Sequence, residues 1–198
     1  TMSSPSEYLP VPFAPTQIDR DYKAGVDAVR LSVSPRPHVD IEGVVAQLGP
    51  WDTRASAVGG LVRLSTGAVD VGVMGGSFRH DAVAGGFMSV GVKGTVLRGE
   101  VSRTAPDDPI DRGRRPSFWR GGVGLDRQLS SVVGLTAEVV YDGFGERRAA
   151  DYPLVLVSPR VRRGEVTSPG LMTAGGTVTW RFHPLGTLST LALMNLTD

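Results

Sequence analysis

The side chains that most often carry enzymatic or metal chemistry are few in this sequence and lie far apart. The chain has no cysteine and three histidines, His38, His80 and His183, which fall in separate predicted turns or loops. Without cysteine there is neither a disulfide framework nor a thiolate zinc site. No phosphate-binding loop, nucleophile elbow or metal-ligand spacing is present either. We therefore expect no catalytic residue, no cofactor, no metal site and no enzymatic activity.

Two local clusters could still take part in polar chemistry. His80 and Asp81 are adjacent, but a catalytic acid–histidine pair also needs a nucleophile or a second carboxylate within reach. The stretch PDDPID at 106–111 offers carboxylates that could coordinate a divalent cation, or it could be an acidic loop in water. We interpret His80 as a surface histidine and residues 106–111 as a solvated loop.

The basic residues do not form the surface that nucleic-acid binding requires. The 21 Lys and Arg residues nearly balance the 20 Asp and Glu residues, for a formal net charge of +1. Arginines gather in two short clusters, at positions 112, 114 and 115 and at positions 160, 162 and 163. A nucleic-acid-binding protein usually shows a basic face, whereas short clusters are typical of solvated loops. We expect no nucleic-acid partner.

Ten segments alternate apolar with polar residues, which is the pattern of β-strands with one apolar and one polar face. Their approximate ranges are 25–34, 38–48, 55–65, 68–77, 82–92, 95–103, 117–127, 132–142, 170–182 and 187–197. No segment keeps the apolar period of about 3.6 residues that is typical of a helix. The pattern predicts an all-β protein.

The connections between these segments alternate in length. Short connections are expected at SPRP near 35, at Thr66-Gly67, at Lys93-Gly94, at QLSS near 129 and at HPLG near 184. Longer connections are expected at GPWDT near 51, at SFRHD near 79, at 104–116 and at 143–169. Short periplasmic turns at one end and longer extracellular loops at the other are typical of outer-membrane barrels.

The apolar face of the segments carries no charge in the middle of a strand. It consists mainly of valine, alanine and glycine, and its charged members, Asp27, Arg103 and Arg127, fall at segment ends. A soluble core needs large interlocking side chains. Lipid makes no such demand, but a charge at the bilayer midplane costs about 2–4 kcal/mol. We therefore interpret this face as lipid-facing.

Four aromatic residues on this face fall at its two ends. Trp119 and Tyr141 lie near the long loops, and Trp180 and Phe182 lie beside the short HPLG turn. Interfacial aromatic girdles occupy these two depths in membrane barrels. We predict that these four residues form a sparse lipid-facing girdle.

The opposite face carries the charged residues, which we expect to face the lumen. In a water-filled barrel such charges set which ions or solutes pass. The alternative is that they pair with one another and only satisfy the interior. The predicted lumen-facing residues are Arg30, Asp40, Glu42, Arg63, Asp70, Arg98, Glu100, Arg120, Asp126, Glu138, Asp142 and Arg181.

Turn positions also predict which of these charges meet. A two-residue turn at Thr66-Gly67 places Arg63 directly opposite Asp70. A turn centred on Leu129 places Arg120 opposite Glu138 in the same way. Because turn length fixes the register of a hairpin, both pairs are expected as cross-strand neighbours on the inner face.

Several segments together resemble porin-like bacterial outer-membrane β-barrel proteins, among them GVDAVRLSVSP, GAVDVGVMGGSF, SVVGLTAEVVYDGFG and LSTLALMNLTD. The resemblance is one of pattern and covers residues 25–198. It implies a location in the outer membrane of Gram-negative bacteria. Such barrels close with a strand that ends in an aromatic residue, whereas this chain ends in Asn195-Leu196-Thr197-Asp198. We therefore expect the strands to be part of a larger barrel.

The expected fold is a transmembrane antiparallel up-and-down β-barrel with about ten strands at 25–198, preceded by a Pro-rich loop or lead-in segment at 1–24. Its expected function is that of a passive channel for small polar solutes or ions, with the lipid bilayer as partner. One alternative is a structural barrel of an envelope complex that binds other envelope proteins. Its lumen would be filled by Leu61, Met74, Phe87 and Phe118. The other alternative is a soluble lipocalin-like binding barrel.

Overall fold

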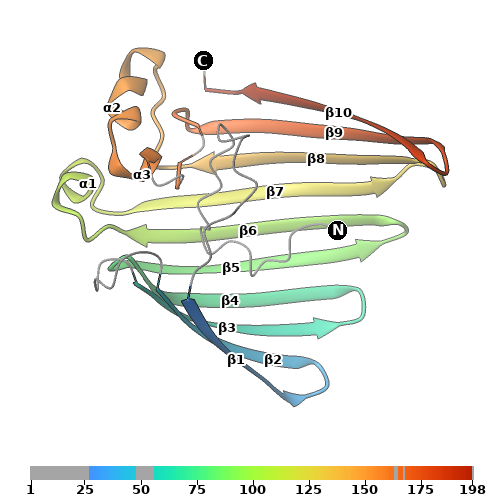
Figure 1. Cartoon of the computed structure of the whole chain (residues 1–198), viewed down its shortest axis with the longest axis horizontal. Coiled ribbons are helices and arrows are strands. Elements are labelled where there is room, and N and C mark those ends of the chain that lie inside the picture. Colours follow the sequence, from blue (N-terminus) through green and yellow to red (C-terminus); the bar gives the residue numbers. More distant parts are fainter. Residues whose placement is uncertain (1–26, 48–55, 163–164, 167, 198) are drawn as a thin grey trace.

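The protein is built on one antiparallel sheet of ten strands that pair in the order of the sequence (Figure 1). The computed structural model describes residues 27–47, 56–162, 165–166 and 168–197. The first five strands are β1 (Asp27–Arg36), β2 (Val39–Gln47), β3 (Ser56–Thr66), β4 (Val69–Phe78) and β5 (Asp81–Val92). The other five are β6 (Thr95–Ala105), β7 (Phe118–Gln128), β8 (Val133–Asp142), β9 (Met172–His183) and β10 (Gly186–Asn195). The all-β prediction with ten up-and-down strands is confirmed, and the predicted segment 1–24 lies outside the described residues.

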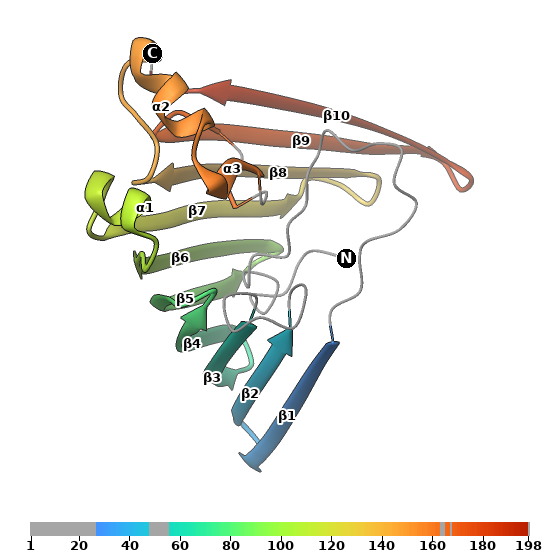
Figure 2. The ribbon, with the colours of Figure 1, turned by 60° about the vertical axis from the view of Figure 1, so that its left-hand side comes forward.

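The sheet is curved but open (Figure 2). Strands β1 and β10 are its two edges, and no pairing joins them within the described residues. The predicted closure into a barrel is therefore not present in this sheet. The physical reason is that each strand pairs only with its neighbours in the sequence, and the curvature does not bring the two edges together.

The helices lie in the two long described connections, at one end of the strands (Figure 1). Helix α1 (Pro109–Arg114) connects β6 to β7. The connection from β8 to β9 contains η3 (Ala149–Asp151), α2 (Tyr152–Leu156) and α3 (Pro159–Arg162). We call this the loop end and the opposite end the turn end. Within the described part of the chain, no helix is long and apolar enough to cross a membrane.

One connection at the loop end is shorter than expected. Strand β4 ends at Phe78 and β5 begins at Asp81, so only Arg79 and His80 lie between them. Both residues have positive φ, at 51° and 70°, which is the backbone of a type I′ hairpin turn. The turn could not be recognised from the sequence because Arg79 and His80 are not the glycine or asparagine residues that type I′ turns favour.

The registers at two predicted turns differ from expectation. In β3–β4 the turn is Gly67-Ala68, so Arg63 stands opposite Gly72, and Asp70 stands opposite Ser65. The positive φ of Gly67, 63°, suits the first central position of a type II′ turn. In β7–β8, Arg120 stands opposite Asp142 instead of Glu138. Both displacements are even, from 70 to 72 and from 138 to 142, so every side chain keeps its predicted face.

Buried apolar side chains gather at the loop end. One cluster contains Phe118, Phe144, Val155 and Val166, and another contains Ala46, Ala57 and Phe78. The strand residues of the two clusters lie near strand termini, on the face that also carries the strand charges: Phe118, Ala46, Ala57 and Phe78. We call that face the inner face and the opposite one the outer face. Among the described residues the core is therefore small and lies at the loop end, while most of the sheet is a single layer.

The turn at Gly67 allows a test of the register. A Cβ at Gly67 would meet nothing within 4 Å, but φ is positive there. A Cβ at Gly43 in β2 also meets nothing, and its φ lies outside the positive range. We expect Gly67→Ala to lower the free energy of unfolding by about 1–2 kcal/mol. Gly43→Ala should leave it unchanged or raise it slightly. Urea unfolding midpoints measure both, and equal midpoints would contradict the turn.

Candidate functional site

The register of the sheet places all the charged residues predicted for the lumen on the inner face. Direct cross-strand neighbours such as Asp40 and Arg63, or Arg120 and Asp142, link the positions from strand to strand. The residues are Arg30, Asp40, Glu42, Arg63, Asp70, Arg98, Glu100, Arg120, Asp126, Glu138, Asp142 and Arg181. Their shared face is a property of the sheet, and the lumen they were assigned to stays a prediction.

Most of these charges are paired with one another. Arg63 Nη2 lies 3.1 Å from Asp70 Oδ1, and Arg120 Nε lies 3.0 Å from Asp142 Oδ1. Further ion pairs join Arg30 to Glu42 and Arg98 to both Asp126 and Glu138. Arg63 thus meets Asp70 although the two residues are not directly opposed. A long arginine side chain reaches a diagonal partner as easily as a direct one.

A glycine makes the longest of these connections possible. Arg98 in β6 and Glu138 in β8 both stand opposite Gly124 of the intervening strand β7. A Cβ at Gly124 would lie 2.6 Å from Arg98 Nε, so the arginine occupies the space above the glycine. Its Nη2 reaches Glu138 Oε2 at 3.2 Å. The glycine-rich inner face therefore lets arginine side chains lie across neighbouring strands.

Three of the predicted inner residues are not in these pairs. Asp40 accepts a hydrogen bond of 2.5 Å from Ser34 Oγ and stands directly opposite Arg63. Glu100 stands opposite Gly122 in β7. Arg181 is exposed and forms no ion pair with any residue that the structure describes. The inner face is thus polar along β1 to β9, with most of its charge locally compensated.

The four aromatic residues predicted for a girdle lie on the outer face, at its two ends. Trp119 and Tyr141 are near the loop end, where β7 begins and β8 ends. Trp180 and Phe182 lie near the turn end, with ring centroids 5.6 Å apart. All four are exposed. Their contact with lipid stays a prediction.

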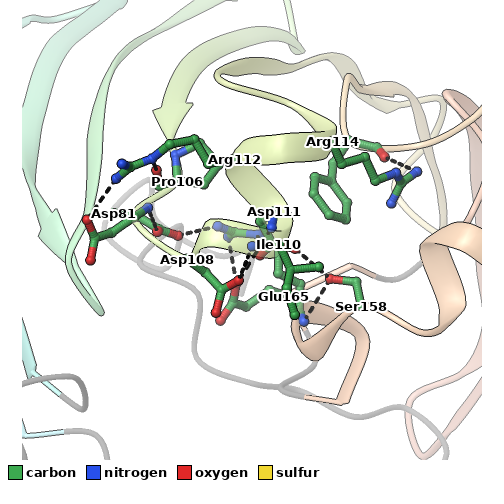
Figure 3. A network of polar contacts seen from close by, with 12 residues as sticks. Asp81, Pro106, Asp108, Ile110, Asp111, Arg112, Arg114, Ser158 and Glu165 are labelled. Atoms are coloured by element: carbon green, nitrogen blue, oxygen red, sulfur yellow. Dashed lines mark hydrogen bonds and ion pairs between the residues drawn. The ribbon is translucent and has the colours of Figure 1, made fainter.

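A buried arginine at the loop end forms the densest polar cluster among the described residues. Arg160 of α3 is 2% exposed and contacts three carboxylates. Its partners come from the start of β5, from α1 and from the segment after α3. The nitrogen–oxygen distances are 2.5 Å to Asp81, 2.7 Å to Asp111 and 2.9 Å to Glu165. Figure 3 shows Asp111, a residue of α1, near the middle of this network, with Asp81 to one side of it and Ser158 to the other.

The cluster fastens the β8–β9 connection to the sheet. Burial alone would lower the pKa of Arg160, but the carboxylates, with Asp81 foremost, outweigh burial and raise it above its ordinary value. The guanidinium also lies 5.4 Å from the ring centroid of Phe118 and 5.5 Å from that of Phe144. Arg160 Nε and Asp111 Oδ2 are close but make no aligned hydrogen bond, so their contact is an ion pair only. Arg160 therefore carries its charge in the folded protein.

The sequence interpretation of these segments was wrong for Asp111 and Arg160, whereas Asp107 and His80 are exposed as expected. Residues 106–111 were predicted to be a solvated loop, yet Asp111 is 1% exposed. The arginines near 160 were read in the same way, yet Arg160 is buried. Asp81 is paired with Arg160. No local signal marks the cluster, because Arg160 and Asp81 are 79 positions apart in the chain.

A second anchor lies beside the first. Arg114 Nη2 lies 2.7 Å from Glu146 Oε1, and Arg115 Nη2 lies 3.4 Å from Glu146 Oε2. Arg114 also donates to the carbonyl oxygens of Phe144 and Leu154, at 3.3 Å and 3.2 Å. The β6–β7 and β8–β9 connections are thus tied together at the loop end.

The histidines do not assemble a site. His38, His80 and His183 lie at separate connections or strand ends. Within the described residues, no group of three or more His, Asp or Glu side chains could hold a metal ion. The chemistry that this arrangement supports is electrostatic, through the paired inner face and the arginines of the loop end.

No protein-family model, curated protein or solved structure matches the chain. The resemblance to porin-like barrels therefore rests on the pattern of the strands. A function has to be inferred from the two faces of the sheet and from its loop end.

The buried cluster leads to a sharp prediction. Arg160→Met would leave three carboxylates buried without their cation, which costs about 3–5 kcal/mol. We expect peptides that cover α2 and α3 to exchange their amide hydrogens at least tenfold faster. Arg112→Met, which breaks the exposed pair with Asp107, should cost less than about 1 kcal/mol and leave these peptides protected. Hydrogen-exchange mass spectrometry would contradict the anchoring role if both variants behaved alike.

Proposed function

We propose that the ten strands form the wall, or part of the wall, of a β-barrel in a bacterial outer membrane. The observation that carries this proposal is the outer face. Large apolar side chains on this face are exposed from β1 to β10, for example Val29 (74%), Val123 (64%) and Met194 (63%). Among the described strands, charged side chains on this face occur only near strand ends, at Asp27, Arg36, Arg103 and Arg127.

Strand length supports the same proposal. The described strands run from nine residues in β2 to twelve in β5. A tilted strand needs about 9–11 residues to cross the hydrocarbon layer of a bilayer. The exposed apolar band and the strand length therefore agree with one another.

A soluble form would have to cover this face. The largest apolar patch on a typical soluble monomer is about 300–600 Å². Here the exposed apolar side chains extend from the first to the last of ten strands, and no second layer covers them within the described residues. This favours lipid over the interior of a lipocalin-like barrel as the environment of the outer face.

Within such a barrel, we propose a passive channel for small polar solutes or ions, without enzymatic activity. The support is the inner face, whose charges would line the lumen and whose glycines leave space beside them. Charges lining a wet lumen set ion selectivity. The paired charges would hold the arginines in fixed positions along the wall.

A second candidate is an occluded barrel that serves as a scaffold for other envelope proteins. Leu61 and Met74 stand opposite each other on the inner face, and Phe87 stands opposite Gly72 beside them. Phe118 is buried under the β8–β9 connection. These apolar side chains favour a filled lumen, and conductance distinguishes the two candidates.

The lipid-facing assignment can be tested with two neighbouring valines. Val123 of β7 lies on the outer face and Val140 of β8 lies on the inner face. We expect Val123→Arg to cost about 2–4 kcal/mol of folding into phosphatidylcholine vesicles, because it places a charge in the hydrocarbon layer. Val140→Arg should insert nearly as well as the natural chain. Tryptophan fluorescence and protease protection report insertion, and equal insertion of both variants would overturn the proposal.

The channel proposal predicts a change in ion selectivity. Folded protein in planar bilayers should give conductance steps above the lipid background. Arg98→Gln removes the cation shared by Asp126 and Glu138, so the reversal potential in a salt gradient should shift toward cation selectivity. Arg112→Gln, in an exposed loop pair, should shift it far less. Inserted protein that gives no steps would support the occluded scaffold instead.

A further inference from the structure

A cavity of about 310 Å³ lies at the loop end, beyond the end of β8. Its lining residues include Arg115, Arg147 and Arg148, together with Tyr141 and Leu171. Cavities of this size hold small ligands. Three arginines from two connections therefore line one pocket, which the proposed channel does not use.

The charges of the pocket leave cationic groups free. Two carboxylates, Glu146 and Asp151, also line the cavity. Glu146 is already paired with Arg114 and Arg115, and so is compensated. In contrast, neither Arg147 nor Arg148 forms an ion pair with any residue that the structure describes. The Nε of Arg115 is buried and has no hydrogen-bond partner among the described residues. The pocket thus offers unused donors to an anion.

The pocket lies next to the outer face. Tyr141 belongs to that face and lines the cavity. Gly143, which also lines it, donates to the carbonyl oxygen of Trp119 at 2.8 Å. Arg103 lies near the ring of Trp119, with 5.9 Å between its guanidinium carbon and the ring centroid. Aromatic and cationic side chains thus meet where the apolar face ends, which is the depth of lipid headgroups in a membrane barrel.

We propose that this pocket binds the phosphate headgroup of an anionic membrane lipid whose acyl chains lie along the outer face. Arginine suits this role because its guanidinium presents several donors to phosphate oxygens. The adjoining apolar face favours a lipid over a free phosphate, because it offers a surface for the chains. The inference rests on the proposed membrane location. It adds to that proposal a class of ligand and a position for it, at the loop end of the strands.

The test uses the folded protein in neutral detergent and three probes. These are dihexanoyl phosphatidic acid, dihexanoyl phosphatidylcholine and inorganic phosphate, each titrated by calorimetry below its micelle concentration. We expect phosphatidic acid to bind most tightly, and its binding to weaken as salt rises. The double variant Arg147→Gln/Arg148→Gln should weaken it about tenfold or more. The double variant Arg36→Gln/Arg112→Gln removes the same charge outside the pocket and should leave it unchanged.

Each other outcome overturns the inference. Equal affinity for inorganic phosphate and phosphatidic acid would make the pocket a site for free phosphate. Absence of phosphatidic acid binding, or equal loss in both double variants, would remove the site. Insertion of Val123→Arg into phosphatidylcholine vesicles is a separate readout that involves no anionic lipid. If Val123→Arg inserts poorly, as expected, but the natural chain does not bind phosphatidic acid, the lipid pocket is rejected and the proposed membrane barrel is not.

Discussion

The rest of the structure depends on the exposed apolar outer face of the sheet. Its exposed valines, leucines and methionines follow every strand, and within the described residues no layer of protein covers them. Burial of apolar surface contributes about 25 cal/mol per Å² and is the dominant favourable term in folding. A sheet that leaves one whole face unburied gains this free energy only from an apolar environment or partner. The charged side chains of the inner face, in contrast, need partners from the protein itself.

The inner face and the loop end meet this demand in different ways. On the strands, ion pairs such as Arg63 with Asp70 are partly exposed, and each contributes no more than about 1 kcal/mol. They fix side-chain positions more than they stabilise the fold. At the loop end, Arg160 is buried with its carboxylates, so loss of a single partner is costly. The polar contacts that matter most for stability are therefore those of Arg160.

The strands could be predicted from the sequence because alternation is a local property. The segment expected at 68–77 is β4 (Val69–Phe78), and the one expected at 132–142 is β8 (Val133–Asp142). The registers of β3–β4 and β7–β8 could not, because they depend on which residues, and how many, each turn takes up. Gly67 takes positive φ at the first turn position, whereas Arg79 and His80 do so without the usual residues. The Arg160 cluster joins segments far apart in sequence, so only the folded chain brings them together.

The open edges impose a further demand if the outer face meets lipid. The backbone N–H and C=O groups along the outer edges of β1 and β10 have no strand partner among the described residues. Strand β10 has neither a charge nor a proline in its length, so it lacks the usual protection of a free edge. Unpaired backbone groups are not tolerated in hydrocarbon. Because β1 and β10 run antiparallel in an up-and-down sheet of ten strands, they could pair with each other, or each could pair with a further strand. A membrane form of this sheet therefore has to be closed, by one of these two routes, before its outer face can be covered by lipid.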